Sequence, residues 1–198
     1  VTFAPSDPAT YLPSSGAVNL QVEPAILTVT ANDESREFGK ANPEPMTTIT
    51  GFVNGEDGSI LTSQPVFVID ADANSILGDY SISVSGVVAP NSTINHVAGT
   101  LTVFGLVPVI QGHPANVTTV KGSEASFTST ATGTAPLSWQ WRKGGAPIAG
   151  ATSSTLTLSN VGIIDSGGYD VVVSNIAGTA VSFPAILNVR VLPNFVQS

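Results

Sequence analysis

One short pattern occurs three times along this chain and constrains its fold more than any other feature. A leucine, a polar residue and a valine stand at Leu20–Val22, Leu101–Val103 and Leu187–Val189, with the leucines 81 and 86 residues apart. Each copy is followed within a few residues by a proline: Pro24, Pro108 or Pro193. Such alternation is typical of a strand, and proline interrupts a strand because it cannot donate a ladder hydrogen bond. The spacing predicts a tandem array of small β domains, with two whole modules between the end of one module and the start of another.

Composition points to the same architecture. Charged residues make up only 10% of the chain, while hydrophobic residues make up 42%, enough for packed cores. Thr, Ser, Gly, Val and Pro dominate the rest, and these residues favour strands and turns. No stretch shows the 3.6-residue periodicity of a long amphipathic helix. We therefore expect an all-β fold made of two small β domains in tandem, with strands of partial modules at both ends.

Charge and cysteine content exclude several classes of function. Six basic and fourteen acidic residues give a net charge of −8, and the scattered basic residues form no phosphate-binding stripe, so nucleic acid is not expected as a partner. The absence of cysteine excludes disulfides, thiolate nucleophiles and cysteine-based metal sites. No apolar run reaches the roughly 20 residues of a membrane span. An acidic, lysine-poor and threonine-rich surface is common in secreted bacterial proteins, which predicts an extracellular or cell-surface location.

Turn signals divide the chain into five parts. Residues 1–24 are expected to be the terminal hairpin of a preceding module, with strands at 1–4 and 17–22. Residues 25–104 form the first complete module, 105–107 a connector and 108–191 the second complete module. Residues 192–198 are expected to be the first strand of a following module.

Strand positions follow from alternation within each module. In the first module, Ala25–Ala31 should point Leu27 and Val29 inward. Residues 32–37 are expected to form a polar loop and residues 55–63 to include one helical turn. The other strands of this module are expected at 46–51, 66–69, 80–84 and 97–104. Those of the second module are expected at 126–131, 137–141, 155–158, 168–174 and 181–191.

Residues 26–104 resemble the bacterial surface-protein repeat called the MBG domain of YGX type. The matching stretches are ILTVTANDESREFGKANPEP, ITGFVNGEDGSIL, GDYSISVSG and AGTLTV. The tyrosine of the family's naming motif is Phe38 here, before Gly39 and Lys40, which keeps the aromatic ring and loses a hydroxyl. The stretch VTFAPSDPATYLPSSGAVNLQV within residues 1–24 resembles the tail of the bacterial Ig-like repeats that often precede such modules, which implies that the preceding module is Ig-like.

Residues 108–191 resemble the immunoglobulin I-set pattern in its bacterial form. Trp141 stands on a central strand, and the segment DSGGYDVVVSN places Tyr169 where the family has its tyrosine corner. The two half-cystine positions of the family are Ser129 and Val171, so the inter-sheet disulfide is absent. The resemblance therefore implies a β-sandwich without cysteine whose core coheres by packing. Its expected structural core comprises Trp141, Leu158, Tyr169, Val171 and Val173.

One loop carries a weak metal-binding signal. Asp70, Asp72 and Asn74 place oxygen ligands at alternate positions, as calcium loops do. The pattern then departs from a calcium loop, because its sixth position is Ser75 and its twelfth is Ser81. A solvated acidic turn is the simpler interpretation. We expect no other metal and no cofactor.

Catalytic motifs are missing, so we expect no enzyme activity. The sequence favours a structural segment of a long secreted or cell-surface bacterial protein, acting as a stalk or as a fibre-building array. Its partners would be neighbouring modules or identical subunits, with strand complementation through residues 1–24 or 192–198. One alternative is an adhesin module that binds glycan or protein through exposed aromatic residues such as Trp139 or Tyr11. Another is a set of accessory domains in a large extracellular enzyme.

Overall fold

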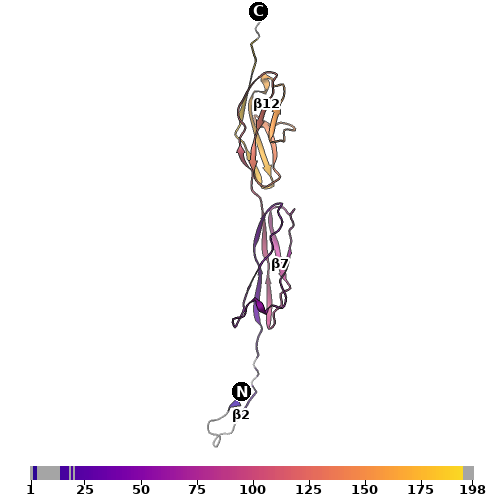
Figure 1. Ribbon diagram of the computed structural model, residues 1–198, viewed down its shortest axis with the longest axis vertical. Helices are drawn as coiled ribbons and strands as arrows, with labels where there is room; N and C mark the ends of the chain where they lie inside the picture. Colours follow the sequence, from indigo (N-terminus) through magenta and orange to yellow (C-terminus); the bar gives the residue numbers. More distant parts are fainter. Residues whose placement is uncertain (1, 4–13, 18, 20, 194–198) are drawn as a thin grey trace, which may run out of the picture.

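The computed structural model describes residues 2–3, 14–17, 19 and 21–193, and it shows two β modules that follow one another along a single long axis (Figure 1). We call residues 25–104 the first module and residues 108–191 the second module. Apart from two short 3-10 turns, every regular element of the described residues is a strand, which confirms the all-β fold. None of these residues belongs to a helix long and apolar enough to cross a membrane.

The first module consists of a three-stranded and a four-stranded sheet. Their strand orders are β5-β3-β8 and β4-β9-β7-β6. The strands are β3 (Ala25–Ala31), β4 (Glu34–Glu37), β5 (Thr47–Thr50), β6 (Val66–Ile69), β7 (Gly78–Ser85), β8 (Ser92–Val97) and β9 (Gly99–Phe104). The short turn η1 (Gly58–Ile60) lies where one helical turn is predicted, and β6 has the predicted bounds.

Alternation along β3 places one face of this strand in the core. Leu27, Val29 and Ala31 are buried while Ile26 is exposed, so the predicted inward direction of Leu27 and Val29 is confirmed. Burying a side chain of this kind contributes about 1.5–3 kcal/mol. Val29 and Ala31 belong to the core cluster of the module, together with Ala71, Ile82, Val84, Val87, Leu101 and Val103.

Two segments of the first module pass from one sheet to the other next to each other, one from β3 to β4 and one from β8 to β9. β3 runs parallel to β8 in one sheet, and their continuations β4 and β9 run parallel to each other in the second sheet. At this crossing, a Cβ on Gly99 would lie 2.4 Å from the carbonyl oxygen of Ala31 and 2.7 Å from that of Asn32. Since no side chain fits there, glycine permits the close approach of the two backbones.

The sheet change accounts for two differences between the predicted and the observed strands. Residues 32–37 do not form only a polar loop, because Glu34–Glu37 continues as β4 after the crossing. The closing strand expected at 97–104 is present but begins later, because the chain leaves β8 at Val97 and enters the other sheet as β9 at Gly99. β8 was missed, since its exposed face carries polar residues that weaken the strand signal.

The second module is a sandwich. One sheet has the order β11-β19-β17-β14-β15, with β18 also paired to β17, and the pairs β10-β13 and β12-β16 make up the rest. The strands are β10 (Val109–Gly112), β11 (Val117–Val120), β12 (Ala125–Thr128), β13 (Thr130–Thr132), β14 (Ser138–Lys143), β15 (Ala146–Pro147), β16 (Thr155–Leu158), β17 (Gly167–Asn175), β18 (Gly178–Val181) and β19 (Ala185–Arg190). A second 3-10 turn, η2 (Ile163–Asp165), precedes β17. The predicted bounds of β16 are confirmed, whereas β10 and β11 were not predicted.

Aromatic residues occupy the centre of the second module. Trp141 is fully buried, and its indole Nε1 donates to the carbonyl oxygen of Ser153 at 2.9 Å. The ring of Phe127 lies between those of Trp141 and Tyr169, at centroid distances of 6.2 and 5.0 Å. Val171 is buried in the same cluster, and the partly buried Leu158 packs against it. The side chain of Ser129, at a half-cystine position of the Ig pattern, is buried without a hydrogen-bond partner.

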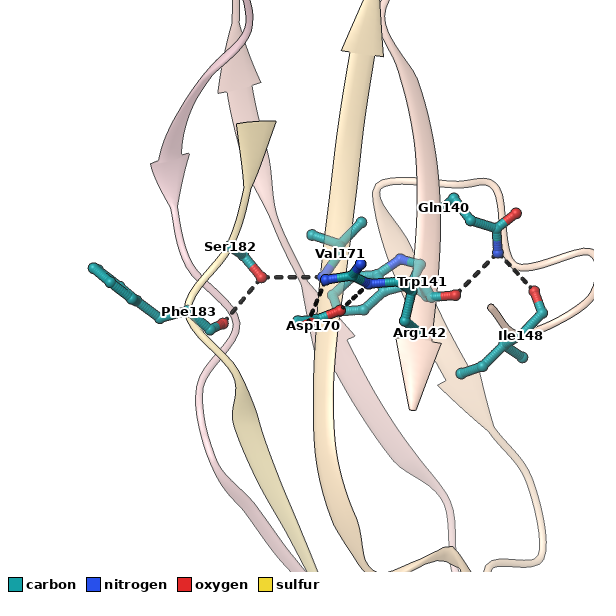
Figure 2. Close-up of polar contacts among 8 residues, drawn as sticks. All are labelled: Gln140, Trp141, Arg142, Ile148, Asp170, Val171, Ser182 and Phe183. Atoms are coloured by element: carbon teal, nitrogen blue, oxygen red, sulfur yellow. Dashed lines mark hydrogen bonds and ion pairs between the residues drawn. The ribbon is translucent and has the colours of Figure 1, made fainter. Parts of the chain in front are cut away.

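The predicted single strand at 181–191 is wrong, because β18 and β19 are separated at Ser182, Phe183 and Pro184. The buried hydroxyl of Ser182 accepts from the Val171 backbone N–H at 3.0 Å and donates to the carbonyl oxygen of Phe183 at 2.9 Å (Figure 2). A side chain therefore takes the place of a ladder bond where the strand is interrupted. The predicted strand at 126–131 is likewise divided into β12 and β13.

Other polar contacts support the sheet beside this interruption. Arg142 and Asp170 are cross-strand partners and form a bidentate ion pair, with distances of 2.7 and 2.8 Å (Figure 2). The side-chain amide of Gln140 donates to the carbonyl oxygens of Trp141 and Ile148, and so fixes the loop that follows β15 (Figure 2).

The expected hairpin at the start of the chain has a different second strand. β1 (Thr2–Phe3) pairs with β2 (Ser14–Ser15), and Ala17, Asn19 and residues 21–24 are not in strands. Most residues of the expected hairpin tip, and residues 194–198 of the expected final strand, lie outside the described part of the chain.

Candidate functional site

At the connection between the two modules, hydrogen bonds join the first module, the connector and the second module. We take this junction as the candidate functional site. The chain passes through it at Gly105–Val107, and the backbone of Leu106 is held on both sides. Its N–H donates to the hydroxyl of Thr134 at 2.7 Å. Its carbonyl oxygen accepts from the Thr134 N–H at 3.0 Å and from the Asn175 side-chain amide at 2.7 Å. The second module thus binds the connector as it would bind a short strand.

Asn175 uses both ends of its side-chain amide in this site. Its Nδ2 donates to the carbonyl oxygens of Leu106 and Thr134, while its Oδ1 accepts from the N–H groups of Ala177 and Gly178 at 2.9 and 3.0 Å. One side chain therefore fixes the turn after β17 and links it to two other segments. Such an amide turn is a local arrangement that asparagine favours.

The first module contributes a carboxylate to the same site. Glu37, the last residue of β4, accepts a hydrogen bond from the hydroxyl of Thr134, which is only 2% exposed. Thr134 therefore donates to one module while it accepts from the connector. Because a buried hydroxyl without partners is costly, these contacts favour one relative position of the two modules.

Apolar contacts enclose the connector at Gly105. A Cβ built on Gly105 would lie 3.0 Å from the Cβ of Ala177 and 3.3 Å from a methyl of Leu77. Leu77 belongs to the first module and Ala177 to the second, so side chains of both modules lie against the connector. In the turn after β17, a Cβ on Gly178 would lie 3.1 Å from a methyl of Val107, so this turn also lies against the connector.

A tyrosine hydroxyl positions the turn that carries Leu77. Tyr80 donates to the carbonyl oxygen of Ile76 at 2.9 Å, four residues earlier in the chain. Tyr169 makes the same contact with the carbonyl oxygen of Asp165 at 2.7 Å in the second module. The sequence predicted the corner at Tyr169 but missed that at Tyr80. The signal is a glycine two residues before each tyrosine, at the start of β7 and of β17.

The corner at Tyr169 makes a pH-dependent contribution to the stability of the second module. Burial, and secondarily the charge of Asp165, raises the pKa of Tyr169 above its ordinary value of about 10. The folded state therefore favours the neutral phenol, and this contribution is complete below pH 10 and lost as pH rises through the raised pKa. We expect Tyr169→Phe to cost about 1 kcal/mol at pH 7, with a difference from wild type that shrinks above pH 10. Urea unfolding at pH 8 and pH 11 measures it, and a constant difference would contradict the assignment.

The loop proposed for calcium is held by protein groups. Oδ1 of Asp72 accepts from the N–H of Asn74 at 2.9 Å. The buried guanidinium of Arg36 donates to the carbonyl oxygen of Asp72, and the amide of Asn42 donates to that of Ala71 at 2.6 Å. Several oxygens of this loop are thus already engaged. Calcium binding there stays a prediction.

Arg36 is an ionic group that sequence reasoning did not single out. It is 5% exposed, and its guanidinium donates to neutral oxygens of Asn42, Glu37 and Asp72. The described part of the chain holds no group of three or more His, Cys, Asp or Glu side chains arranged to bind a metal ion.

The proposed aromatic binding surface is not assembled by the described residues. Trp141 is fully buried, and Trp139 packs partly buried against the same core, with its indole Nε1 enclosed and without a hydrogen-bond partner. Tyr11 lies outside the described residues.

The junction itself was not predicted. Glu37 and Thr134 are 97 residues apart, and Leu106 and Asn175 are 69 apart, so only the folded chain brings them together. The one local signal is the sequence from Asn175 to Gly178, which is typical of an amide-capped turn.

Fold and junction define the chain as two small β modules joined in tandem. Residues 27–102 match the model of the MBG domain (YGX type), and residues 107–175 match that of the immunoglobulin domain. The chain therefore consists largely of an MBG domain followed by an immunoglobulin-like domain, which confirms the resemblance seen in its motifs. Both are modules of a typically non-catalytic kind.

A curated relative shares part of this chain. Endoglucanase C from Cellulomonas fimi is 39% identical over 95 residues, which cover 46% of this chain and 9% of that protein. The match thus spans less than a tenth of the relative's length.

Several solved structures also match parts of the chain. An Ig chain from the complex of titin M10 with obscurin-like 1 is 27% identical and covers 46% of this chain and all of its own, with a TM-score of 0.42. Domains 3–5 of Drosophila OTK are 15% identical, with coverages of 81% and 60% and a TM-score of 0.45. Titin domains I67–I69 are 13% identical, with coverages of 86% and 67% and a TM-score of 0.45.

Proposed function

We propose that the chain is a stiff spacer segment of a longer extracellular protein, and that it transmits tension along its axis. The observation that carries this proposal is the parallel pairing of early and late strands in both modules. In the MBG module, β3 and β4 run parallel to β8 and β9. In the immunoglobulin-like module, β11 runs parallel to the last strand, β19.

Parallel pairing decides how a pulled module yields. The chain enters each module at one end and leaves it at the other, so tension slides the early strand along the late one. Ladder bonds run across the strands and therefore share this shear instead of opening one after another. Forced unfolding depends on the unfolding rate, which such a barrier lowers. This mechanical behaviour suits a spacer.

A spacer also requires a junction that does not bend freely. Contacts of Leu106, Thr134, Asn175 and Glu37 support this, because they connect both modules and the connector. The connector is also short, and Pro108, the residue that follows it, is buried. A short connector with bound backbone groups behaves differently from a flexible linker.

The junction is tested with the double variant Thr134→Val and Asn175→Ala. We expect the two modules to tumble as one body in the wild type and to reorient independently in the variant. The loss of several hydrogen bonds, each contributing about 0.5–1.5 kcal/mol, releases the connector. NMR relaxation of each module measures this directly.

A matched control carries the same changes at exposed positions, Thr157→Val and Asn188→Ala. The control should tumble as the wild type does. If the junction variant and the wild type show the same rotational anisotropy, the junction is not what makes the pair stiff.

A second candidate function is that of accessory domains in a large extracellular enzyme. The partial similarity to an endoglucanase favours it. The gene sequence on both sides of the segment encoding this chain tests the idea. A catalytic domain in the same reading frame would support it, and a reading frame of binding or spacer modules alone would contradict it.

Fibre formation by strand complementation through residues 1–24 or 192–198 stays a prediction. Removing either segment and measuring filament length by electron microscopy would test it.

A further inference from the structure

The end of the immunoglobulin-like module that lies away from the junction repeats the construction of the MBG end that docks at the junction. In the MBG module, the carbonyl oxygen of Phe104 at the end of β9 accepts from the N–H of Phe38 at 2.8 Å. In the other module, the carbonyl oxygen of Arg190 at the end of β19 accepts from the N–H of Lys121 at 2.8 Å. The two modules therefore close their final strands in the same way.

In both modules, the turn that precedes the tyrosine corner lies at the end where the final strand leaves the module. In the MBG module this turn brings Leu77 against Gly105 and the neighbouring module. In the immunoglobulin-like module the turn is η2, which is joined to β19 by a bond from the Val189 N–H to the Ser166 hydroxyl at 3.1 Å. The end that carries η2 thus has the same arrangement of turn and final strand as the MBG end at the junction.

Apolar side chains at this second end face solvent. Ile164 is 86% exposed and Ile163 53%, and the following residues Val191 and Leu192 are 62% and 66% exposed. At the occupied junction, Leu77 in the corresponding turn is half-buried, while Leu106 and Val107 after the last strand are 55% and 53% exposed. Apolar residues that gather at one end of a module suit a partner that covers them.

Basic side chains set the chemistry of this end. Lys121 and Arg190 are exposed and form no ion pair with other described residues. Lys143 donates to the carbonyl oxygen of Ile164 at 2.6 Å and lies 4.0 Å from the carboxylate of Asp165, so its charge is already partnered by η2. Glu124, in the same loop as Lys121, is an acidic residue of this end. Its single negative charge is smaller than the two positive charges of Lys121 and Arg190, so this end is positive overall.

The opposite end of the chain is acidic and concave. A hollow of about 610 Å³ lies at the start of the MBG module, between the incoming residues Val22–Ala25 and the loops at 53–56 and 90–92. Glu23 and Glu56 line it, and Asp57 follows in the same loop. Val53 and Pro90 supply apolar walls, and no basic residue lines the hollow.

We propose that the η2 end of the immunoglobulin-like module binds the hollow of an MBG module in a second copy of this chain, head to tail. Ile164 would enter the apolar part of the hollow, while Lys121 and Arg190 would face Glu23 and Glu56. The start of an immunoglobulin-like module is a poorer partner, because its loops at 133–137 and 175–178 carry no charge. The proposal rests on the spacer function and adds the order of its units, MBG and immunoglobulin-like modules in alternation.

Such a contact is heterologous, so it extends an array instead of closing a dimer. Within a longer chain the connector would raise the effective concentration of the two ends, so the contact between free copies is expected to be weak. The test therefore uses the full chain at about 1 mM and low salt, where charge interactions are least screened.

Two charge-reversed variants test the contact by complementation. One carries Lys121→Glu and Arg190→Glu, and the other carries Glu23→Lys and Glu56→Lys. We expect sedimentation to show self-association of the wild type and at least a roughly tenfold weaker association of each variant alone. A mixture of the two variants should associate within about threefold of the wild type, because acidic and basic ends then face each other again. A third variant, Ile164→Ser, should weaken association without reversing any charge.

A wild-type chain that stays monomeric at this concentration overturns the proposal, and so does a mixture that associates no better than its components. Circular dichroism of each variant confirms that both modules remain folded. These results are independent of the junction variant, which tests stiffness within a single chain and can succeed when this contact fails.

Discussion

Replacing Trp141 by alanine is expected to destabilise the immunoglobulin-like module strongly while the MBG module is little affected. Trp141 is fully buried, lies against Phe127 and donates its indole N–H to the Ser153 carbonyl. Removing such a side chain costs about 3–5 kcal/mol through lost burial and the cavity that remains. Domains of this size have stabilities of roughly 5–15 kcal/mol, and this one has no disulfide to compensate.

Differential scanning calorimetry measures this effect, since each module has a separate core and should give its own transition. The transition of the immunoglobulin-like module should fall steeply or vanish, and that of the MBG module should move little. Trp139→Ala serves as the control, because Trp139 is only partly buried at the edge of the same core. Equal effects of both substitutions, or one transition that shifts as a whole, would contradict this account.

Replacing Arg36 by alanine is expected to destabilise the MBG module by about 3 kcal/mol. The buried guanidinium donates to the carbonyl oxygens of Asp72 and Glu37 and to the side chain of Asn42. Removing it takes away three part-buried hydrogen bonds from a charged donor, each contributing about 1.5–3 kcal/mol, offset in part by no longer burying a charge. It also disconnects β4 from the loop at 70–75.

Both tryptophans lie in the immunoglobulin-like module, which separates the readouts. Urea unfolding followed by far-ultraviolet circular dichroism should show the loss, whereas the tryptophan fluorescence transition should stay in place. Lys40→Ala is the control, because Lys40 is an exposed cation four residues away. Arg36→Lys should restore only part of the stability, because an ammonium cannot reproduce the planar set of donors. An Arg36→Ala variant as stable as the control would show that this network contributes nothing.

Alternation in the sequence predicted those parts of the fold in which one strand face is buried and the other is not. Leu27 and Val29 were placed correctly for this reason, and so were the bounds of β6 and β16. Glu34–Glu37 was not, because its sequence ESRE looks like a solvated loop. Its strand depends on Arg36 finding oxygen partners from Asn42 and Asp72, which only the tertiary structure supplies.

The site was predicted less well than the fold. The core around Trp141 and the corner at Tyr169 follow short motifs and could be expected from the family pattern. The junction depends on Thr134, whose partners Glu37 and Leu106 come from another module and from the connector. No periodicity within one module reports such a contact, because it is specified by how two finished surfaces meet.

Because the chain has no cysteine, a module that unfolds under high force can extend along its whole length. A module that gives way releases its whole chain, since no covalent bridge retains a loop. Some 80 residues between Ala25 and Phe104 would then extend to about 280 Å, at roughly 3.5 Å per residue. Rupture of one module would lengthen the tether without breaking it and lower the force on its neighbours. Each folded module thus contains extra chain length, which is released only when the pairing of its early and late strands breaks.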